Sequence, residues 1–423
     1  PTACAWLQPA ALFLAAACSN SVYLCFSGIT DEVAAWLATS PGAIDALASL
    51  GNAATAVGYP LAASVADRAG IGAGFTAGVS VTAVGCGLRA LGGAAGSFAL
   101  LVVGQFVGNL GNCFLNVLPA ALAVRRFPAH QQGLATAIGQ VGVDLGAFGG
   151  PLLGGAFRSR PGRLIWMQFL ASLAVLPSAL LFLGGARGSG AGVQAGADCP
   201  HAAGVCRRSL WFLRLPGAAL LCLGATGGIT VLNTFPAALE QVVCAVPGLG
   251  VNALSGALAL SVLLGEAVTG AMADVLSTGP VLCCSALVVC IGWLLCLLGW
   301  LWLVPPVAIM VGWVLLATFG MGAMQMLSFL RAAEAAPSSA GTASALLHFA
   351  TSVACVLVQL LTAVLLNSPT CEIRIVRDIM LGWSVTGWVA SALIILAVAV
   401  LQGSPLGWRC GHRRAPGAVI AAV

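Results

Sequence analysis

Residues 279–302 read GPVLCCSALVVCIGWLLCLLGWLW, an apolar run that carries no charged side chain. A helix of about 20 apolar residues crosses the hydrocarbon core of a bilayer. The apolar residues do not alternate with polar ones, so the run predicts a helix rather than a strand of a membrane β-barrel. Similar runs recur along the chain, which is therefore predicted to be an all-α polytopic membrane protein.

The composition agrees with this prediction. The chain is 60% hydrophobic and 7% charged, whereas soluble domains carry about 25% charged residues. All 17 basic residues are arginine, and no basic patch interleaved with aromatic residues indicates a nucleic-acid partner. The expected partners are a lipid bilayer and a small-molecule substrate, and we expect a monomer without a cofactor.

The apolar runs divide into two sets of six. We expect helices near 5–34, 42–66, 71–93, 97–124, 130–156, 163–184, 210–242, 250–273, 279–302, 305–330, 338–366 and 379–402. The polar stretch 185–208 separates an N-terminal six-helix bundle (1–184) from a C-terminal one (209–402), and 403–423 forms a tail. Twelve helices in two pseudo-symmetric halves resemble the major facilitator superfamily, whose substrate site lies at the midplane between the halves.

Arginine placement predicts the orientation. Arg68, Arg125, Arg126 and Arg331 fall on the same side as the arginines of the central stretch and the tail. Fewer arginines, Arg89 among them, fall on the other side, so the positive-inside rule makes the first side, and both termini, cytoplasmic. The membrane is either the plasma membrane or that of an organelle.

The loop ASVADRAGIGAG, residues 63–74, resembles the superfamily's loop motif G-x-x-x-D-R-x-G-R-[KR]. In that motif an Asp and an Arg pair at a helix end and lock the halves in one state. The resemblance implies a gating role for Asp67 and Arg68. Asp274 stands at the equivalent point of the second half, without an adjacent arginine.

Four ionisable residues within the predicted membrane helices are candidates for function. Asp144 stands in GQVGVDLGAFGG, residues 139–150, where a charge costs roughly 2.5–3.5 kcal/mol or more. It is a candidate for binding a cationic substrate or for coupling to protons, or it is a neutral Asp bonded within the bundle. Glu266 and His348 are further proton-coupling candidates, with interhelical contacts as the alternative. Glu240, near a helix end, is either a gate or a solvated residue.

Amides accompany these groups. Asn109, Asn112 and Asn116 fall on one helical face, and a polar stripe of this kind lines either water or a partner helix. Gln140, one turn before Asp144, can join a polar site. These residues, together with His348, are candidate substrate ligands.

Four blocks resemble the family related to the feline leukaemia virus subgroup C receptor. They are NSVYLCFS at 20–27, PAALAVRRFP at 119–128, TFPAALEQVVC at 234–244 and GTASALL at 341–347, and they occur in family order. The resemblance implies a choline transporter or, as the runner-up, a haem exporter. Family cage positions correspond to Tyr23 and Asn233, and family glutamines correspond to Asp144 and Ser352. The altered cage keeps an aromatic face and adds a carboxylate, which favours a cationic or amine-like solute.

The sequence lacks the motifs that are typical of other function classes. The chain has no G-x-x-x-x-G-K-[ST] nucleotide loop and no H-E-x-x-H zinc motif, so neither ATP drive nor an intramembrane enzyme is predicted. A proton-coupled transporter of another metabolite and a transporter-like receptor remain alternatives.

The cysteines give one further expectation. The less studied branch of the family carries cysteines at the positions of Cys244 and Cys371, which are either disulfide-bonded or free thiols. Cys199, His201 and Cys206 have poor spacing for zinc, so no metal site is expected.

Overall fold

The computed structural model describes residues 3–27, 29–183, 204–234, 251–299, 307–365 and 373–403, and every regular element in these ranges is helical. The long segments are α1 (Ala3–Asn20), α3 (Pro41–Arg68), α4 (Ile71–Ala94), α5 (Phe98–Asn116) with α6 (Leu118–Arg126), α7 (Gln132–Ala156), α8 (Pro161–Val175) with α9 (Leu180–Leu183), α11 (Ala218–Thr234), α13 (Val251–Leu276), α14 (Thr278–Leu298), α15 (Val307–Ala335), α16 (Ala340–Leu365) and α17 (Ile373–Gly403). Two short helices, α2 (Thr30–Trp36) and α10 (Val205–Leu213), precede α3 and α11.

The predicted set of membrane helices is confirmed. Within the described ranges eight helices are long and apolar enough to cross a membrane, and up to ten if the bent pairs α2–α3 and α10–α11 each form one span. With the more polar α1 and α7, the described helices make up the twelve segments that the apolar runs predict.

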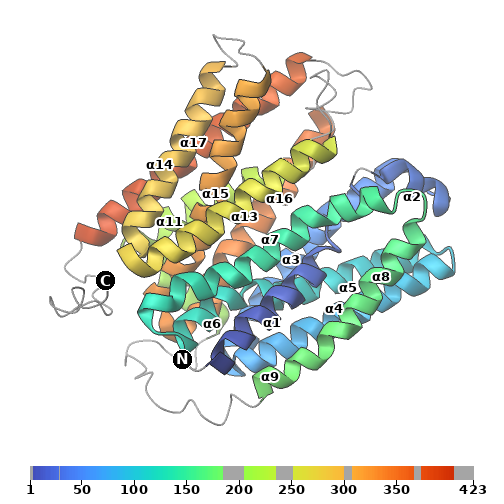
Figure 1. Ribbon diagram of the computed structural model, residues 1–423, viewed down its shortest axis with the longest axis horizontal. Helices are drawn as coiled ribbons and strands as arrows, with labels where there is room; N and C mark the ends of the chain where they lie inside the picture. Colours follow the sequence, from blue (N-terminus) through green and yellow to red (C-terminus); the bar gives the residue numbers. More distant parts are fainter. Residues whose placement is uncertain are drawn as a thin grey trace.

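The helices pack as two groups that lie side by side (Figure 1). One group contains α1 to α9, and the other contains α11 to α17. The groups meet mainly where α7 lies along α13 and where α3 packs on α16. Figure 1 shows α7 and α13 running along this boundary over much of their length.

The first predicted helix, 5–34, is wrong in its extent, because the chain leaves the helix after Asn20. Residues 21–27 form successive turns closed by short-range backbone bonds, such as Tyr23 N to Asn20 O (3.0 Å) and Ser27 N to Leu24 O (3.0 Å). Irregular backbone is tolerated at membrane depth only when protein surrounds it. Val22 and Cys25 are accordingly buried, and the turn leaves Tyr23 at the end of α1.

Two other predicted helices are also interrupted. The run 97–124 breaks at Val117, because Pro119 lies in the first turn of α6 and cannot continue the preceding hydrogen bonds. The run 210–242 begins differently, since α10 meets α11 at 102°. The α10 helix also takes up residues 205–208, the last part of the predicted central loop. The rest of that loop and the tail after residue 403 lie outside the described residues.

Small residues set the approach of α7 to α13. A Cβ added at Gly133 would overlap the Gly270 carbonyl oxygen, and one at Gly270 would stand 2.5 Å from the Ala137 Cβ. Backbones can come this close only when neither position bears a side chain. These glycines therefore let the two halves touch directly along α7 and α13, which we call the α7–α13 seam.

The N-terminal half also buries an arginine. Arg89 was expected near a helix end on the outer side of the membrane. It belongs to α4, and its side chain is fully buried. Its guanidinium donates to Gln168 Oε1 (2.8 Å) and Cys25 Sγ (3.1 Å) and lies over the Phe26 ring. These contacts tie α4 to α8 and to the turn after α1.

Candidate transport site and latch

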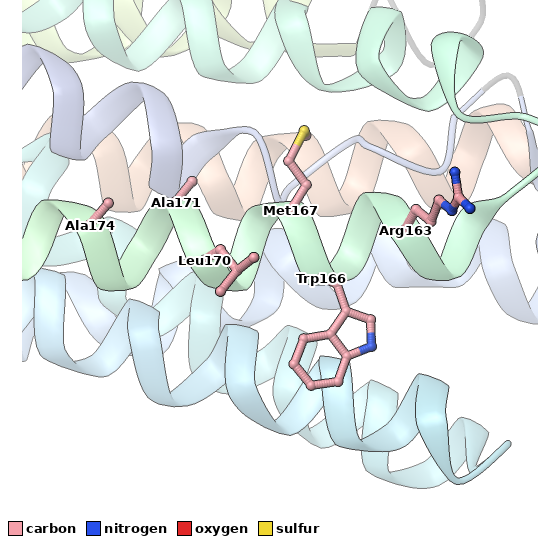
Figure 2. Close-up of a pocket in the computed structure, with 6 residues that line it drawn as sticks. All are labelled: Arg163, Trp166, Met167, Leu170, Ala171 and Ala174. Carbon is pink, nitrogen blue, oxygen red and sulfur yellow. The ribbon is translucent and has the colours of Figure 1, made fainter.

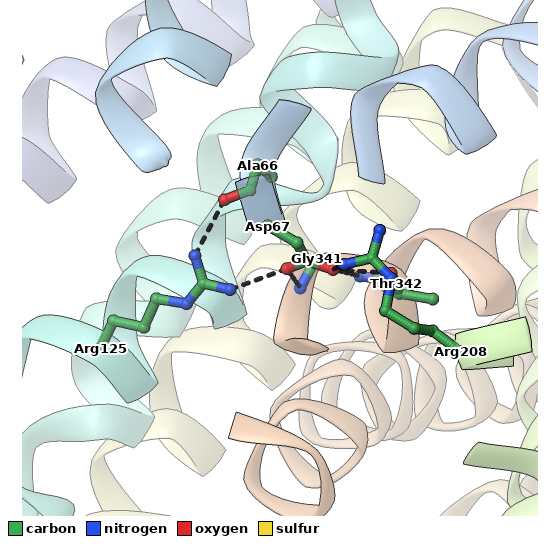
Figure 3. Close-up of polar contacts among 6 residues, drawn as sticks. All are labelled: Ala66, Asp67, Arg125, Arg208, Gly341 and Thr342. Carbon is green, nitrogen blue, oxygen red and sulfur yellow. Dashed lines mark hydrogen bonds and ion pairs between the residues drawn. The ribbon is translucent and has the colours of Figure 1, made fainter. Parts of the chain in front are cut away.

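At one end of the molecule the carboxylate of Asp67 joins the two halves (Figure 3). Its side chain is fully buried and accepts from Arg125 Nη2 at 2.7 Å and Arg208 Nη1 at 3.1 Å. From the other half, the Gly341 and Thr342 amides donate at 2.9 Å each, and Thr342 Oγ1 donates at 2.6 Å. The carboxylate thus caps the N-terminus of α16, where a negative charge is favoured. We call these five residues the Asp67 latch and this end of the molecule the latch face.

The predicted role of Asp67 in holding the halves together agrees with this geometry, but its partners differ from the motif. Arg125, near the end of α6, and Arg208, from α10, are the arginines that bond the carboxylate, rather than the adjacent Arg68. Arg125 also donates to the Ala66 carbonyl at 2.9 Å. The sequence contained one usable signal, the Arg125–Arg126 pair at a helix end, but nothing that linked Arg208 to Asp67.

Asp274 makes the reciprocal contact. From the end of α13 it accepts from the Gly133 amide at 2.7 Å and the Leu134 amide at 2.9 Å, which lie in the first turn of α7. Each half therefore contributes one carboxylate that caps a helix of the other half. Asp67 and Asp274 stand at equivalent points of the two halves, and each caps a helix terminus. The described bonds of the half-exposed Asp274 come from backbone amides.

Asp144 lies midway along α7 and faces the C-terminal half. Its side chain is 3% exposed and accepts from Gln325 Nε2 of α15 at 3.4 and 3.3 Å. Gln140 Nε2, one turn earlier on α7, donates at 3.5 Å. The structure thus brings Gln140 to Asp144 as predicted. Gln325 adds a hydrogen-bond donor from the C-terminal half.

Glu266 of α13 completes this cluster. Its carboxyl is fully buried and lies near that of Asp144 across the α7–α13 seam. Neither of its oxygens receives a hydrogen bond from an N–H or O–H donor, and the buried Gln325 Oε1 also lacks a donor. We call Asp144, Glu266, Gln140 and Gln325 the carboxyl cluster, and it spans the seam between the halves.

His348 sits in an aromatic stack instead of the carboxyl cluster. Its ring lies 4.0 Å from that of Phe329 and 4.9 Å from that of Tyr59, nearly parallel to both. Its Nε2 lies 3.1 Å from the Asn116 carbonyl oxygen. Because Tyr59 comes from α3 and His348 from α16, the stack closes the second contact between the halves.

The asparagine stripe faces partner helices rather than open water in this conformation. Asn109 and Asn112 are buried and bonded to each other at 3.1 Å, and Asn112 Oδ1 accepts from Ser19 Oγ. Asn116 exchanges bonds with Asn20 and donates to Tyr59 Oη. Of the two interpretations of the stripe, these contacts support interhelical bonding for Asn112 and Asn116, whereas the bonds of Asn109 stay within α5.

Tyr23 and Ser352, two of the positions named by the family resemblance, lie at the contact between α3 and α16. Ser352 Oγ lies 3.0 Å from Thr55 Oγ1, again joining α16 to α3. One turn or more away, Gln359 Oε1 accepts from Asn52 Nδ2 at 3.0 Å, and the Tyr23 hydroxyl neighbours both amides. Asn233 is half-buried on α11. This polar set is separate in its bonds from the carboxyl cluster.

Glu240, Cys244 and Cys371 lie outside the described residues, as do Cys199 and His201. Cys206 is exposed and free. Among the residues that the structure does describe, no group of three or more metal-binding side chains exists.

An outer groove of 680 Å³ runs along α8 (Figure 2). Its lining comes from one helix and consists of Arg163, Trp166, Met167, Leu170, Ala171 and Ala174. Trp166 and Leu170 are exposed, so the groove faces the lipid side of the bundle and contains none of the predicted site residues.

These features define a helical membrane protein whose halves enclose ionisable groups, the arrangement of secondary transporters. The chain matches the Major Facilitator Superfamily over residues 11–359 and belongs to it. Comparison with curated protein sequences gives no match.

Solved structures share the fold. The proton:xylose symporter XylE is similar at 13% identity and a TM-score of 0.67, with 93% of this chain and 94% of that chain covered. A bacterial homologue of the iron transporter ferroportin, in an outward-facing state, gives 13% identity and a TM-score of 0.69, with 93% and 98% covered. The human organic anion transporter MFSD10 gives 14% identity and a TM-score of 0.65, with 95% and 100% covered. Their substrates differ, so the likeness concerns the fold.

Proposed function

We propose that this protein is a secondary-active or facilitative transporter of a small organic cation, working by alternating access. The observation that carries the proposal is the carboxyl cluster. Asp144 and Glu266 lie at mid-helix between the halves, and none of the ion pairs among the described residues involves either carboxyl. Ionisable residues at membrane depth mark substrate or ion pathways.

The charge of the cluster favours a cation over other solutes. The cluster has two acidic groups and three donor-free acceptor atoms, two on Glu266 and one on Gln325, and these attract positive charge and repel an anion. A haem exporter fits poorly, because the porphyrin would bring two more carboxylates to this place. Choline transport rests on the resemblance to the feline leukaemia virus subgroup C receptor-related family alone. The polar set around Tyr23 has an aromatic face but no carboxylate among its described contacts.

Alternating access is supported by the contacts that hold the halves together. The Asp67 latch and the Asp274 cap close one end of the molecule, and both consist of bonds that can break without unfolding a helix. The carboxyl cluster lies farther along the same seam. Separation of the halves at the latch face therefore exposes it to that side of the membrane.

The test uses Asp144→Asn, which keeps the shape of the side chain and removes its charge. Purified protein is screened by thermal stabilisation with choline, ethanolamine, basic amino acids and haem, and uptake of the stabilising cations is measured in proteoliposomes. We expect Asp144→Asn to reduce cation uptake about tenfold or more, because a hydrogen bond to a charged group contributes about 1.5–3 kcal/mol.

The matched control is Asp45→Asn, which makes the same change on an exposed residue at the start of α3. Its uptake should equal that of the wild type. Equal uptake by Asp144→Asn and the wild type would exclude the carboxyl cluster from cation recognition.

A further inference from the structure

The carboxyl cluster contains an imbalance of hydrogen-bonding groups. Its two donors, Gln140 Nε2 and Gln325 Nε2, both point to Asp144. Both oxygens of Glu266 and the Oε1 of Gln325 are buried and accept no hydrogen bond from a donor. An unsatisfied buried acceptor costs about 1–3 kcal/mol, so three in one place indicate that a donor-bearing species belongs there.

The charge of the carboxyl cluster also indicates that a cationic species belongs there. Asp144 and Glu266 are buried as neighbours on α7 and α13, and two carboxyls close enough to interact in such a place cannot both ionise unless a cation joins them. A single proton on one carboxyl lets it donate to the other, and the pair then has a net charge of −1. The described contacts place this pair between α7 and α13, one carboxyl from each half.

Among the residues that the structure describes, the helices packed around the pair contribute no other charged group that offsets its charge. The charged residues of α6 and α15 lie at the latch face, where Arg125 bonds Asp67 and Arg331 bonds Glu334. Within the described residues, α1 and α14 carry only cysteines as titratable groups. His130 lies beside Asp274, His348 is held in its stack, and Arg163 begins α8 at the far end.

From this geometry we infer that the cluster holds either one shared proton or the ammonium group of a protonated amine, and that the transporter exchanges one for the other. The inference rests on the proposed cation transport and specifies the substrate class. An ammonium with N–H groups can donate to Asp144, Glu266 and Gln325 Oε1 together. A quaternary ammonium has no N–H group and leaves the same acceptors unsatisfied.

The exchange balances in charge and atoms. When the amine enters as R–NH₃⁺, the carboxyl O–H bond breaks and the proton leaves to water, while N–H···O bonds form to both carboxylates. The loaded pair has two negative charges and one positive charge, so its net charge stays at −1. One proton leaves for each amine bound.

The position of the pair across the seam makes the exchange obligatory. With neither proton nor amine, closing the halves would bring two carboxylates together in a medium of low dielectric constant, where their repulsion is strong. Only a carrier loaded with one of the two cations can close. The empty carrier does not return, and uptake of amine therefore requires movement of protons in the opposite direction.

The experiment compares ethanolamine with choline, which differ only in three N-methyl groups. Proteoliposomes containing a trapped pH dye report uptake of labelled substrate and proton movement together. We expect wild-type protein to take up ethanolamine about tenfold or more faster than choline, the factor supplied by one hydrogen bond between charged groups. One proton should leave the vesicle for each ethanolamine that enters.

Glu266→Gln removes the proton-sharing partner and keeps Asp144. Because Glu266 also accepts from the ammonium, this variant should take up ethanolamine more slowly than the wild type. The uptake that Asp144 still supports should proceed without proton movement and without response to a pH gradient. The matched control, Glu32→Gln, changes a glutamate that pairs with an exposed arginine, and should couple like the wild type. As a measurement without substrate, infrared difference spectra should show a protonated carboxyl band in the wild type that Glu266→Gln lacks.

The outcomes separate the two proposals. Failure of the wild type to bind or transport any organic cation overturns the proposed function and this inference with it. Ethanolamine uptake without proton movement leaves cation transport standing and overturns the exchange. Choline uptake equal to or faster than ethanolamine uptake overturns the assignment to an N–H donor, as does coupling that persists in Glu266→Gln.

Discussion

Replacing Asp67 by Asn tests whether the latch holds the two halves closed. The carboxylate is fully buried, and its five bonds come from two guanidinium groups, two backbone amides and one hydroxyl. The substitution Asp67→Asn keeps the size of the side chain but presents an amide where two arginines require an acceptor of opposite charge. Removing one partner of a buried ion pair costs about 3–5 kcal/mol.

Most of that cost falls on the closed state, because the bonds from Arg208, Gly341 and Thr342 reach Asp67 from α10 and α16. Only the Arg125 bond lies within the same half as Asp67. Since each 1.4 kcal/mol is tenfold in an equilibrium constant, a loss of about 3–5 kcal/mol raises the open population by about 10²–10³ or more. Hydrogen exchange of backbone amides reports such opening directly. We therefore expect the Gly341 and Thr342 amides to exchange about 10² times faster or more in Asp67→Asn.

Asp274→Asn is the matched comparison at the other half. Asp274 caps the backbone amides of Gly133 and Leu134, and a charge at a helix terminus contributes about 0.3–1 kcal/mol. Exchange at Gly133 and Leu134 should rise by less than about tenfold. A change of about 1.4 kcal/mol alters an equilibrium constant tenfold. If the exchange rates of the Gly341 and Thr342 amides in Asp67→Asn stay within about a factor of two of the wild-type rates, the latch does not control opening.

Two further variants test the contacts between the halves. Gly270→Ala places a Cβ 2.5 Å from that of Ala137, and overpacking of this kind costs about 1–3 kcal/mol. Its melting temperature should fall, whereas Gly256→Ala on the same helix, with no atom within 4 Å, should melt like the wild type. His348→Ala removes the ring between Tyr59 and Phe329 and should destabilise the protein by about 3–5 kcal/mol in chemical unfolding, as aromatic-to-alanine changes do. His348→Phe keeps the stack and should lose only about 1 kcal/mol with the bond to Asn116; equal losses in both variants would refute the stacking role.

The apolar runs were sufficient to predict the helices, because each helix must satisfy its own backbone in lipid. They could not predict the break after Asn20, where the residues remain apolar and the turn is stabilised by burial among other helices. The interruption before Pro119 had a local signal, since proline cannot donate a backbone hydrogen bond. Local chemistry thus marks one of the two breaks, and tertiary packing determines the other.

The site was predictable only in part, for a related reason. A carboxylate in an apolar run is conspicuous, which is why Asp144 and Glu266 could both be selected from the sequence. Their contact with each other, and the contribution of Gln325, depend on how α7, α13 and α15 pack. The same holds for Asp67, whose sequence neighbour is Arg68 but whose buried partner Arg208 lies in a different helix.

The seam also explains how opening at the latch face controls the carboxyl cluster. Glu266 and Asp274 are eight residues apart on α13, and Leu134 and Asp144 are ten residues apart on α7, so the cap and the cluster are separated by about 12–15 Å along both helices. Between them Gly270 packs against Ala137 without room for water. A proton or amine arriving from the latch face can therefore reach Glu266 only after the Asp274 cap has released α7. In the proposed cycle, the release of the half-exposed Asp274 cap and the exchange of the buried cation are successive steps of the same separation of helices, and we expect the seam to act as a gate as well as a binding site.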